Sequence, residues 1–302
     1  MNDIAVIGGG LMGAGIAQVF ASAGHSVTVF EPNADVRGSI IARTAENLAM
    51  VGRDGSAVQL ISVTGSMTEA VASARYVTEA VPEKLELKRA IFADLVRLSP
   101  RDCILASNTS VIPITRIAEG LNTADRIVGT HWWNPAPLIP LVEVVQAAHT
   151  SDATIATTMK LLQSIGKSPA HVKKDTPGFV ANRLQHALWR EAIAMVADGV
   201  CDAATLDACV KNSFGLRLAV LGPLENADMV GLDLTLDIHK TMMPELDCHA
   251  VPHAFLESRV AAGELGFKSG RGFRAWTASQ MQTLRQILAD HLVAAQNNRK
   301  AS

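Results

Sequence analysis

The chain has 302 residues, which is enough for two domains with sizeable cores. Hydrophobic residues make up 48% and charged residues 19%, as in an ordinary globular enzyme, and a formal net charge of −2 gives no broad attraction to nucleic acid or anionic membranes. No apolar run approaches the roughly 20 residues that cross a bilayer, so we expect neither nucleic acid nor membrane as a partner.

The first thirty residues predict one β-α-β unit. Residues 4–7 form a short apolar run, residues 11–23 an amphipathic stretch and residues 26–30 a β-branched run. No basic leader precedes the first run, which favours a strand over a signal peptide. The four cysteines have neither close CxxC pairing nor His-rich surroundings, so we expect structural thiols, no metal site and a cytoplasmic protein.

A glycine-rich turn follows the first predicted strand and opens the first predicted helix. Its spacing fits G-x-G-x-x-G, in which the first glycine allows a tight turn, the second lets the backbone approach a pyrophosphate, and the third allows close packing of helix on strand. The free N–H groups of the helix N-terminus attract phosphate. The cofactor-binding residues expected here are Gly8, Gly10, Leu11, Met12 and Gly13.

An acidic residue at the end of the second β-branched run identifies the cofactor. Glu31 stands where a carboxylate accepts hydrogen bonds from the adenosine ribose hydroxyls and repels a 2′-phosphate. The nearest following arginine is Arg37, so NAD is favoured over NADP. The alternative, a structural glycine turn that binds no dinucleotide, leaves Glu31 unexplained.

The remaining elements predict an α/β domain followed by an all-α domain. Apolar runs at 75–81, 102–106, 126–129 and 141–145 alternate with helical patterns, notably 84–98 and 152–165, which is typical of a Rossmann-type, parallel, doubly wound sheet. Long helical patterns then follow at 177–199, 203–212, 225–243 and 279–297, with Pro177 in the first turn of the first helix. We therefore expect an NAD-binding domain over residues 1–174 and a helical substrate and dimerisation domain over residues 175–302.

A glutamate in an apolar strand indicates a catalytic pair. Glu143 interrupts the run LVEVV, where a carboxylate is costly unless it is paired, and His131 at the end of the preceding run is the obvious partner. Oxidation of an alcohol needs a base that titrates near neutral pH, which histidine does, and a carboxylate bonded to the far ring nitrogen fixes its tautomer. The alternative is a core histidine at a sheet edge, which does not account for Glu143.

Two polar residues beside this pair are candidates for substrate or nicotinamide contacts. Ser110 ends the motif SNTS, and Asn134 lies in THWWNPAP. Both sequences also form turns readily, so turn and capping chemistry is an equal alternative for these two side chains.

The chain resembles the L-3-hydroxyacyl-CoA dehydrogenase family over nearly its whole length. The resemblance is carried by several motifs in the same order: GGGLMGAGIA (8–17), SNTS (107–110), HWWNP (131–135), PLVEVV (140–145), DTPGFVANR (175–183) and GFKSGRGF (266–273). It implies an NAD-dependent dehydrogenase and a homodimer formed through the helical domain.

The resemblance also implies roles for individual residues. His131 corresponds to the general base and Glu143 to the residue that orients it, while Ser110 and Asn182 would hydrogen-bond the reacting oxygens of the substrate.

For the cofactor, Glu83 and Lys88 match positions that approach the nicotinamide half of NAD. Asn108, in the same SNTS motif, is a further candidate contact.

Two departures from the family pattern concern the substrate. HWWNP replaces HFFNP, and Pro140 stands where a basic residue usually precedes LVEV. The stretch from Arg43 to Thr68 is short and contains no lysine, whereas CoA-using members have a longer basic hairpin there. Since CoA phosphates need cationic groups or helix N-termini, we favour a small hydroxy carboxylate over a CoA ester.

The segments IPLVEV and FGLRLAVLGP (214–223) resemble a side branch of the family that acts on free acids. That branch includes L-gulonate 3-dehydrogenase (λ-crystallin), carnitine dehydrogenase and a pyridine-carboxylate 5-dehydrogenase. Arg217 and Arg190 are candidate carboxylate anchors, with a solvated helix face as the alternative.

Two other functions stay open. One is a short-chain L-3-hydroxyacyl-CoA dehydrogenase, and the other is a non-catalytic NAD(H)-binding protein of the crystallin type. The intact catalytic set argues against the second.

Overall fold

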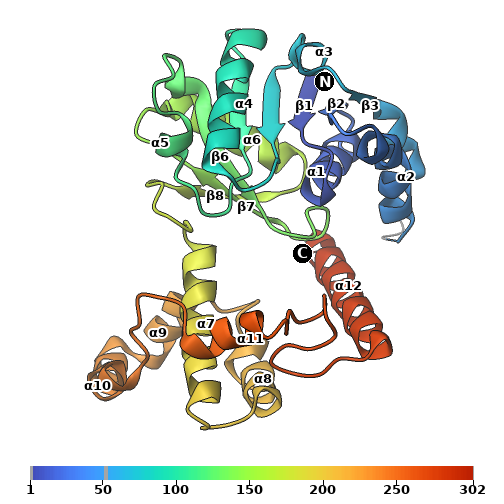
Figure 1. Ribbon diagram of the computed structural model, residues 1–302. Coiled ribbons are helices and arrows are strands. Elements are labelled where there is room, and N and C mark those ends of the chain that lie inside the picture. The colour runs from blue at the N-terminus through green and yellow to red at the C-terminus, as the bar shows by residue number, and fades with distance from the viewer. Residues whose placement is uncertain (1–2, 51–53, 302) are drawn as a thin grey trace. The chain divides into compact units, whose positions relative to one another are not determined.

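The computed structural model of the chain describes residues 3–50 and 54–301 (Figure 1). Eight strands of this part of the chain form one sheet in the order β3-β2-β1-β4-β5-β6-β7-β8. The strands are β1 (Asp3–Ile7), β2 (Ser26–Phe30), β3 (Ile61–Thr64), β4 (Tyr76–Glu79), β5 (Ile104–Ser107), β6 (Ile127–Trp132), β7 (Leu141–Val145) and β8 (Ser168–Val172). The order confirms the predicted doubly wound α/β architecture. The chain adds β2 and β3 on one side of β1 and then continues with β4 on the other side.

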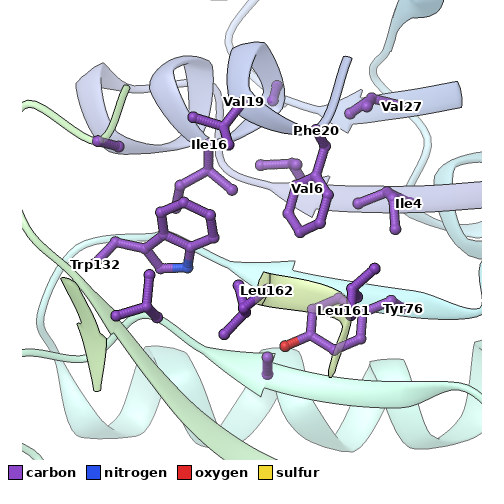
Figure 2. Close-up of a cluster of buried hydrophobic side chains, with 14 of the residues drawn as sticks. Ile4, Val6, Ile16, Val19, Phe20, Val27, Tyr76, Trp132, Leu161 and Leu162 are labelled. Atoms are coloured by element: carbon purple, nitrogen blue, oxygen red, sulfur yellow. The ribbon is translucent and has the colours of Figure 1, made fainter. Parts of the chain in front are cut away.

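Helices cover both faces of the sheet. They are α1 (Leu11–Ser22), α2 (Ala34–Met50), α3 (Met67–Val71), α4 (Leu85–Leu98), α5 (Ile114–Ile117) and α6 (Asp152–Ser164). Along β1, Ile4 and Val6 belong to the core cluster that includes Phe20 of α1, whereas Ala5 and Ile7 belong to the cluster that includes Phe92 of α4. Figure 2 shows part of the first cluster, in which the Phe20 ring lies next to Val6. Alternate residues of one strand are thus buried on opposite faces.

One strand pair runs against the expected direction. β6 and β7 are antiparallel, and the prediction of a fully parallel sheet was wrong at this point. A short loop of residues 133–140 connects the two strands, and a parallel pair would need a crossover connection of a dozen or more residues. β7 and β8 are again parallel and are joined through α6. The antiparallel pair matters for the site, since its register places His131 directly opposite Glu143.

The sequence patterns did not predict α2, β3 or β8. β8 has the sequence SPAHV and is mostly exposed at the sheet edge, where proline is tolerated, so its hydrophobic pattern is weak. The helix predicted over 177–199 begins only at Ala181, because Gly178 and Phe179 have φ values of 76° and 50°. Likewise the helix predicted over 225–243 is two helices separated by Gly231, which has a φ of 104°.

The chain divides into two compact units, Met1–Arg183 with Ala289–Ser302, and Leu184–Leu288. The first unit contains the sheet and extends past the expected boundary at residue 174. The later helices of the chain are α7 (Ala181–Ala197), α8 (Ala203–Lys211), α9 (Pro223–Val230), α10 (Leu232–Met242), α11 (Ala254–Ala261) and α12 (Ala278–Ala301). None of the described helices is both long and apolar enough to cross a membrane.

The second unit has very little buried interior of its own. Among its described residues only Ala194 and Gly272 are buried. Many large apolar side chains are exposed instead, including Leu224, Met229, Leu232, Leu236 and Ile238. These five side chains belong to the consecutive helices α9 and α10, and monomeric proteins rarely expose large apolar patches.

Candidate active site

The glycine turn connects β1 to α1 and leaves space on one side. Gly8 has a φ of 103°, which favours glycine, and a Cβ on Gly13 would lie 1.8 Å from the carbonyl oxygen of Gly8. By contrast, a Cβ on Gly10 would have no heavy atom within 4 Å. Gly10 caps α1 and no side chain bonds to the first N–H groups of the helix, so the helix N-terminus fits a pyrophosphate. Next to it Leu11 is exposed and Met12 packs against the core.

Glu31, directly after β2, lies against this turn. Its Oε2 accepts a hydrogen bond from the N–H of Gly9 at 2.8 Å, and its Oε1 accepts one from the N–H of Asn33 at 3.0 Å. Arg37 donates to the carbonyl oxygen of Glu31 at 2.8 Å, and Arg43 donates to that of Gly9 at 2.6 Å. Both arginines near the Glu31 carboxylate are therefore bound to backbone carbonyls rather than held for a 2′-phosphate. The glycine turn and Glu31 together fit NAD.

The histidine and the glutamate expected to pair lie on adjacent strands. His131 on β6 is 4% exposed and Glu143 on β7 is 1% exposed, and His131 Nδ1 lies 2.7 Å from Glu143 Oε2. Because a carboxylate accepts hydrogen bonds, Nδ1 carries the proton and Nε2 is the basic nitrogen. Nε2 has no hydrogen-bond partner among the described residues. The rings of Trp133 and Phe179 lie 5.2 Å and 5.8 Å from the imidazole, which restricts its orientation.

The second oxygen of Glu143 binds the start of α7. Oε1 accepts hydrogen bonds from the N–H groups of Val180 at 3.0 Å and Ala181 at 3.1 Å. Burial acts to raise the pKa of Glu143, but the hydrogen bond from His131 and those from the two N–H groups outweigh it and hold the pKa below its usual value. Glu143 is thus an ionised carboxylate that can stabilise a protonated imidazole.

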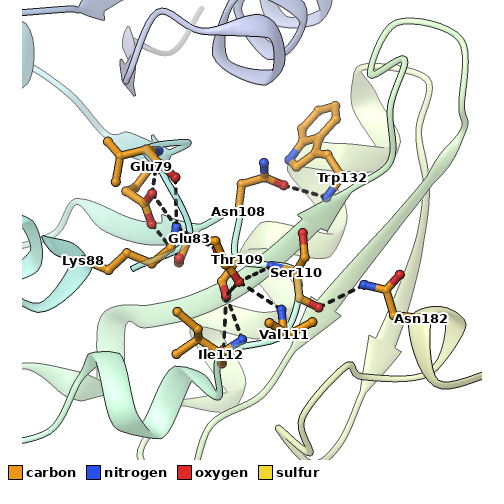
Figure 3. Close-up of polar contacts among 12 residues, drawn as sticks. Glu79, Glu83, Lys88, Asn108, Thr109, Ser110, Val111, Ile112, Trp132 and Asn182 are labelled. Atoms are coloured by element: carbon orange, nitrogen blue, oxygen red, sulfur yellow. Dashed lines mark hydrogen bonds and ion pairs between the residues drawn. The ribbon is translucent and has the colours of Figure 1, made fainter. Parts of the chain in front are cut away.

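The loop that contains Ser110 follows β5 and is held by Glu83 (Figure 3). Oε1 of Glu83 accepts three hydrogen bonds, from the hydroxyl of Thr109 at 2.5 Å and from the N–H groups of Ser110 at 2.9 Å and Val111 at 3.0 Å. Burial acts to raise the pKa of Glu83, but these hydrogen bonds and the nearby charge of Lys88 together lower it.

Two amides connect this loop to its surroundings. Asn182 Nδ2 donates to the carbonyl oxygen of Ser110 at 3.1 Å, and Asn108 Oδ1 accepts from the N–H of Trp132 at 2.9 Å. The structure therefore brings Ser110 and Asn182 together, and Asn108 ties the loop to the strand that contains His131. The Oγ of Ser110 has no hydrogen-bond partner among the described residues and remains available to a ligand.

Lys88, on α4, has a completely buried side chain. Its Nζ lies 2.7 Å from Oε1 of Glu79, whose side chain is also fully buried. Sequence reasoning missed Glu79 and Thr109. A signal existed for Glu79, since it interrupts the apolar run 75–81 as Glu143 interrupts LVEVV.

The remaining predicted residues lie in two places. Asn134 belongs to the loop after β6, which Lys167 holds by donating to the carbonyl oxygens of Ala136 and Ile139. Arg217 and Arg190 belong to the second unit, and Arg217 is exposed. Among the described residues, no group of three or more His, Cys, Asp and Glu side chains could hold a metal ion.

Comparisons with known proteins cover both parts of the chain. Residues 3–176 match the family profile described as 3-hydroxyacyl-CoA dehydrogenase, NAD binding domain, and residues 178–276 match its C-terminal domain. The chain is 36% identical to 5-formyl-3-hydroxy-2-methylpyridine 4-carboxylate 5-dehydrogenase of Mesorhizobium japonicum over 97% of both chains. It is 38% identical to a probable 3-hydroxybutyryl-CoA dehydrogenase of Bacillus subtilis, over 90% of this chain and 96% of that one.

A solved structure agrees with these relatives. The chain superimposes with a TM-score of 0.90, 34% identity and 97% coverage of both chains on a crystal structure described as 5-formyl-3-hydroxy-2-methylpyridine 4-carboxylic acid 5-dehydrogenase, an NAD+-dependent dismutase.

Proposed function

The chain belongs to the 3-hydroxyacyl-CoA dehydrogenase family of NAD-dependent oxidoreductases acting on CH–OH groups, and on this premise we propose that it oxidises or forms the secondary alcohol of a small hydroxy carboxylate. The proposal includes His131 as general base and Glu143 as the residue that orients it. The observation that supports it most directly is the 2.7 Å contact between His131 Nδ1 and Glu143 Oε2.

The proton follows a defined route in this proposal. NAD, when bound, supplies the hydride acceptor. His131 Nε2 removes the proton of the substrate hydroxyl, so that the imidazole becomes positively charged while Nδ1 keeps its proton. Glu143 stabilises this charge without taking the proton, because its own hydrogen bonds keep its pKa low. In the reverse direction His131 returns the proton to the oxygen.

Ser110 and Asn182 complete the site as proposed substrate contacts. The Ser110 hydroxyl donates to the reacting oxygen, which gains negative charge as its proton leaves. The Asn182 amide donates to the Ser110 carbonyl in this structure, and this contact supports a shared position for the two residues. Asn134 and Arg217 are proposed as further substrate contacts.

The cofactor contacts are proposed on the same basis. They comprise Gly8, Gly10, Leu11, Met12 and Gly13 at the turn, Glu31 at the ribose, and Glu83, Lys88 and Asn108 around the nicotinamide half.

A free carboxylate is favoured over a CoA ester for two reasons. The chain is similar over 97% of both lengths to a protein whose name specifies a pyridine carboxylate. It also contains no lysine before Lys84, so cations for the CoA phosphates are scarce in the first part of the chain. The 38% identity to a probable 3-hydroxybutyryl-CoA dehydrogenase favours the second candidate, a short-chain acyl-CoA substrate.

A substrate screen separates these two candidates. Purified protein is assayed with NAD+ and a panel of 3-hydroxy acids and hydroxymethyl or formyl pyridine carboxylates, and with NADH and acetoacetyl-CoA. We expect saturable turnover with at least one free carboxylate and none with acetoacetyl-CoA at high enzyme concentration. Saturable turnover with acetoacetyl-CoA alone contradicts the free-acid proposal.

We further propose that the protein is a homodimer formed through the second unit. This unit has only Ala194 and Gly272 buried among its described residues, which is too little for an independent core. A second copy of the same apolar helices is a partner of matching chemistry, since homodimer interfaces resemble a hydrophobic core cut in half.

A further inference from the structure

The buried ammonium of Lys88 lies between two carboxylates (Figure 3). Its Nζ is 2.7 Å from Oε1 of Glu79, 3.4 Å from Oε2 of Glu83 and 3.4 Å from the carbonyl oxygen of Val81. The side chains of Lys88 and Glu79 are 0% exposed, and that of Glu83 is 33% exposed. Lys88 donates hydrogen bonds to Glu79 and to the carbonyl of Val81, and its contact with Glu83 is an ion pair.

Both carboxylates connect Lys88 to the same loop through hydrogen bonds. The other oxygen of Glu79, Oε2, accepts a hydrogen bond from the hydroxyl of Ser107 at 2.6 Å, at the end of β5. The other oxygen of Glu83, Oε1, accepts the three hydrogen bonds from Thr109, Ser110 and Val111. One cation therefore fixes two carboxylates, which hold the loop before and after Asn108.

We propose that Lys88 is a positioning residue that fixes the Ser110 loop through Glu79 and Glu83. The proposal rests on the proposed function to the extent that Ser110 contacts the substrate. This effect on the loop is separate from the cofactor contact proposed for Lys88 above.

The charges explain why a cation is required at this place. Without Lys88, two carboxylates would lie close together in a largely buried environment, and their repulsion would force one of them to take a proton or to move. A protonated or displaced Glu83 would hold the N–H groups of Ser110 and Val111 less well, because these groups bond to its ionised form. The loop would then open more often.

The test uses the full-length protein and needs no substrate. Hydrogen exchange of the peptide covering residues 107–113 reports on the loop, and a fluorescence titration with NADH reports on direct cofactor contact. The variants are Lys88→Met, the double variant Glu79→Gln with Lys88→Met, and Arg89→Met as a control. Arg89 is the next residue of α4 and pairs with Glu119 at the surface.

For Lys88→Met we expect the 107–113 peptide to exchange about tenfold faster or more, whatever the change in the Kd for NADH. The double variant removes both charges of the buried Lys88–Glu79 pair, so the carboxylates of Glu79 and Glu83 no longer repel each other. The exchange rate of its 107–113 peptide should therefore fall between those of Lys88→Met and the unaltered protein. Arg89→Met should match the unaltered protein in both measurements.

Unchanged exchange of the 107–113 peptide overturns the proposal, whether or not the Kd for NADH rises. A tenfold rise in that Kd without faster exchange would assign Lys88 to direct cofactor contact. If Lys88→Met does not fold, the double variant is used in its place. Exchange of its 107–113 peptide at the rate of the unaltered protein refutes the positioning role. A failure to find an oxidisable hydroxy acid would contradict the proposed function and leave these two measurements unaffected.

Discussion

At the residue scale, two glutamates of the site each accept three hydrogen bonds. Glu143 accepts one hydrogen bond from His131 and two from backbone N–H groups, and Glu83 accepts three from the Ser110 loop. In both residues burial acts to raise the pKa, and the hydrogen bonds outweigh it and lower the pKa. Each carboxylate therefore stabilises the folded state in its ionised form.

Acid should destabilise the protein through these two residues. A carboxyl whose folded-state pKa lies below its unfolded value of about 4.3 contributes stability at neutral pH that is lost as the pH falls through the folded-state pKa. We therefore expect the unfolding temperature to drop as the pH is lowered from about 5 to about 3, measured by circular dichroism. A Glu143→Gln variant should show a shallower drop. The exposed Glu257→Gln should keep the full slope, and equal slopes for all three proteins would contradict this account.

The pairing of His131 with Glu143 could be predicted from the sequence, because a carboxylate in an apolar strand requires a buried partner. The burial of Lys88 beside Glu79 could not be predicted. Charged residues near the start of a helix are usually solvated, and no pattern in AVPEKLELK indicates that the lysine side chain turns inward to Glu79.

At the scale of elements, the glycine turn and the β6–β7 pair shape the site. The turn was evident from its spacing and its place between a strand and a helix. The antiparallel direction of β7 was not evident, because an apolar run such as LVEVV has the same pattern in either direction. The break at Gly231 was missed for a related reason, since one glycine within a helical pattern does not by itself end a helix.

Two glycines of the turn should respond differently to a methyl group. In Gly13→Ala the added Cβ would meet the carbonyl oxygen of Gly8, so we expect a loss of about 1–3 kcal/mol in the free energy of unfolding. In Gly10→Ala the Cβ meets no protein atom, so stability should change by less than about 1 kcal/mol. NADH affinity should nevertheless fall about tenfold or more in Gly10→Ala, because the methyl group occupies the side where the pyrophosphate approaches.

Urea unfolding and a fluorescence titration with NADH measure these two effects. Gly38→Ala in α2, which also has open space around its Cβ, is the control and should retain both stability and NADH affinity. Unchanged NADH affinity in Gly10→Ala would contradict the placement of the pyrophosphate at this turn.

At the scale of the whole molecule, the order of an α/β part followed by a helical part could be predicted from the change in hydrophobic pattern near residue 174. The lack of a buried interior in the second unit could not be read from hydrophobic periodicity. The helical patterns show an apolar face but do not show whether the same chain or another copy covers it.

We expect the protein to be a dimer in solution whose unfolding temperature rises with protein concentration. Placing charges on the exposed apolar surface of α10 with Leu232→Lys and Ile238→Lys should shift the mass toward that of a monomer, measured by light scattering after size exclusion. Leu87→Lys, on an exposed position of α4 in the first unit, should leave the mass unchanged. A monomeric mass for the unaltered protein at all concentrations would contradict the proposed dimer.

The central claim is that His131 removes the proton while the glycine turn holds NAD. It is tested most directly by the turnover of His131→Gln with the carboxylate substrate identified in the screen, alongside its Kd for NADH. We predict a loss in kcat of about 10² to 10⁴-fold with a Kd for NADH within about twofold of the original, and no loss for the exposed His149→Gln. Turnover of His131→Gln close to that of the unaltered protein would contradict the claim.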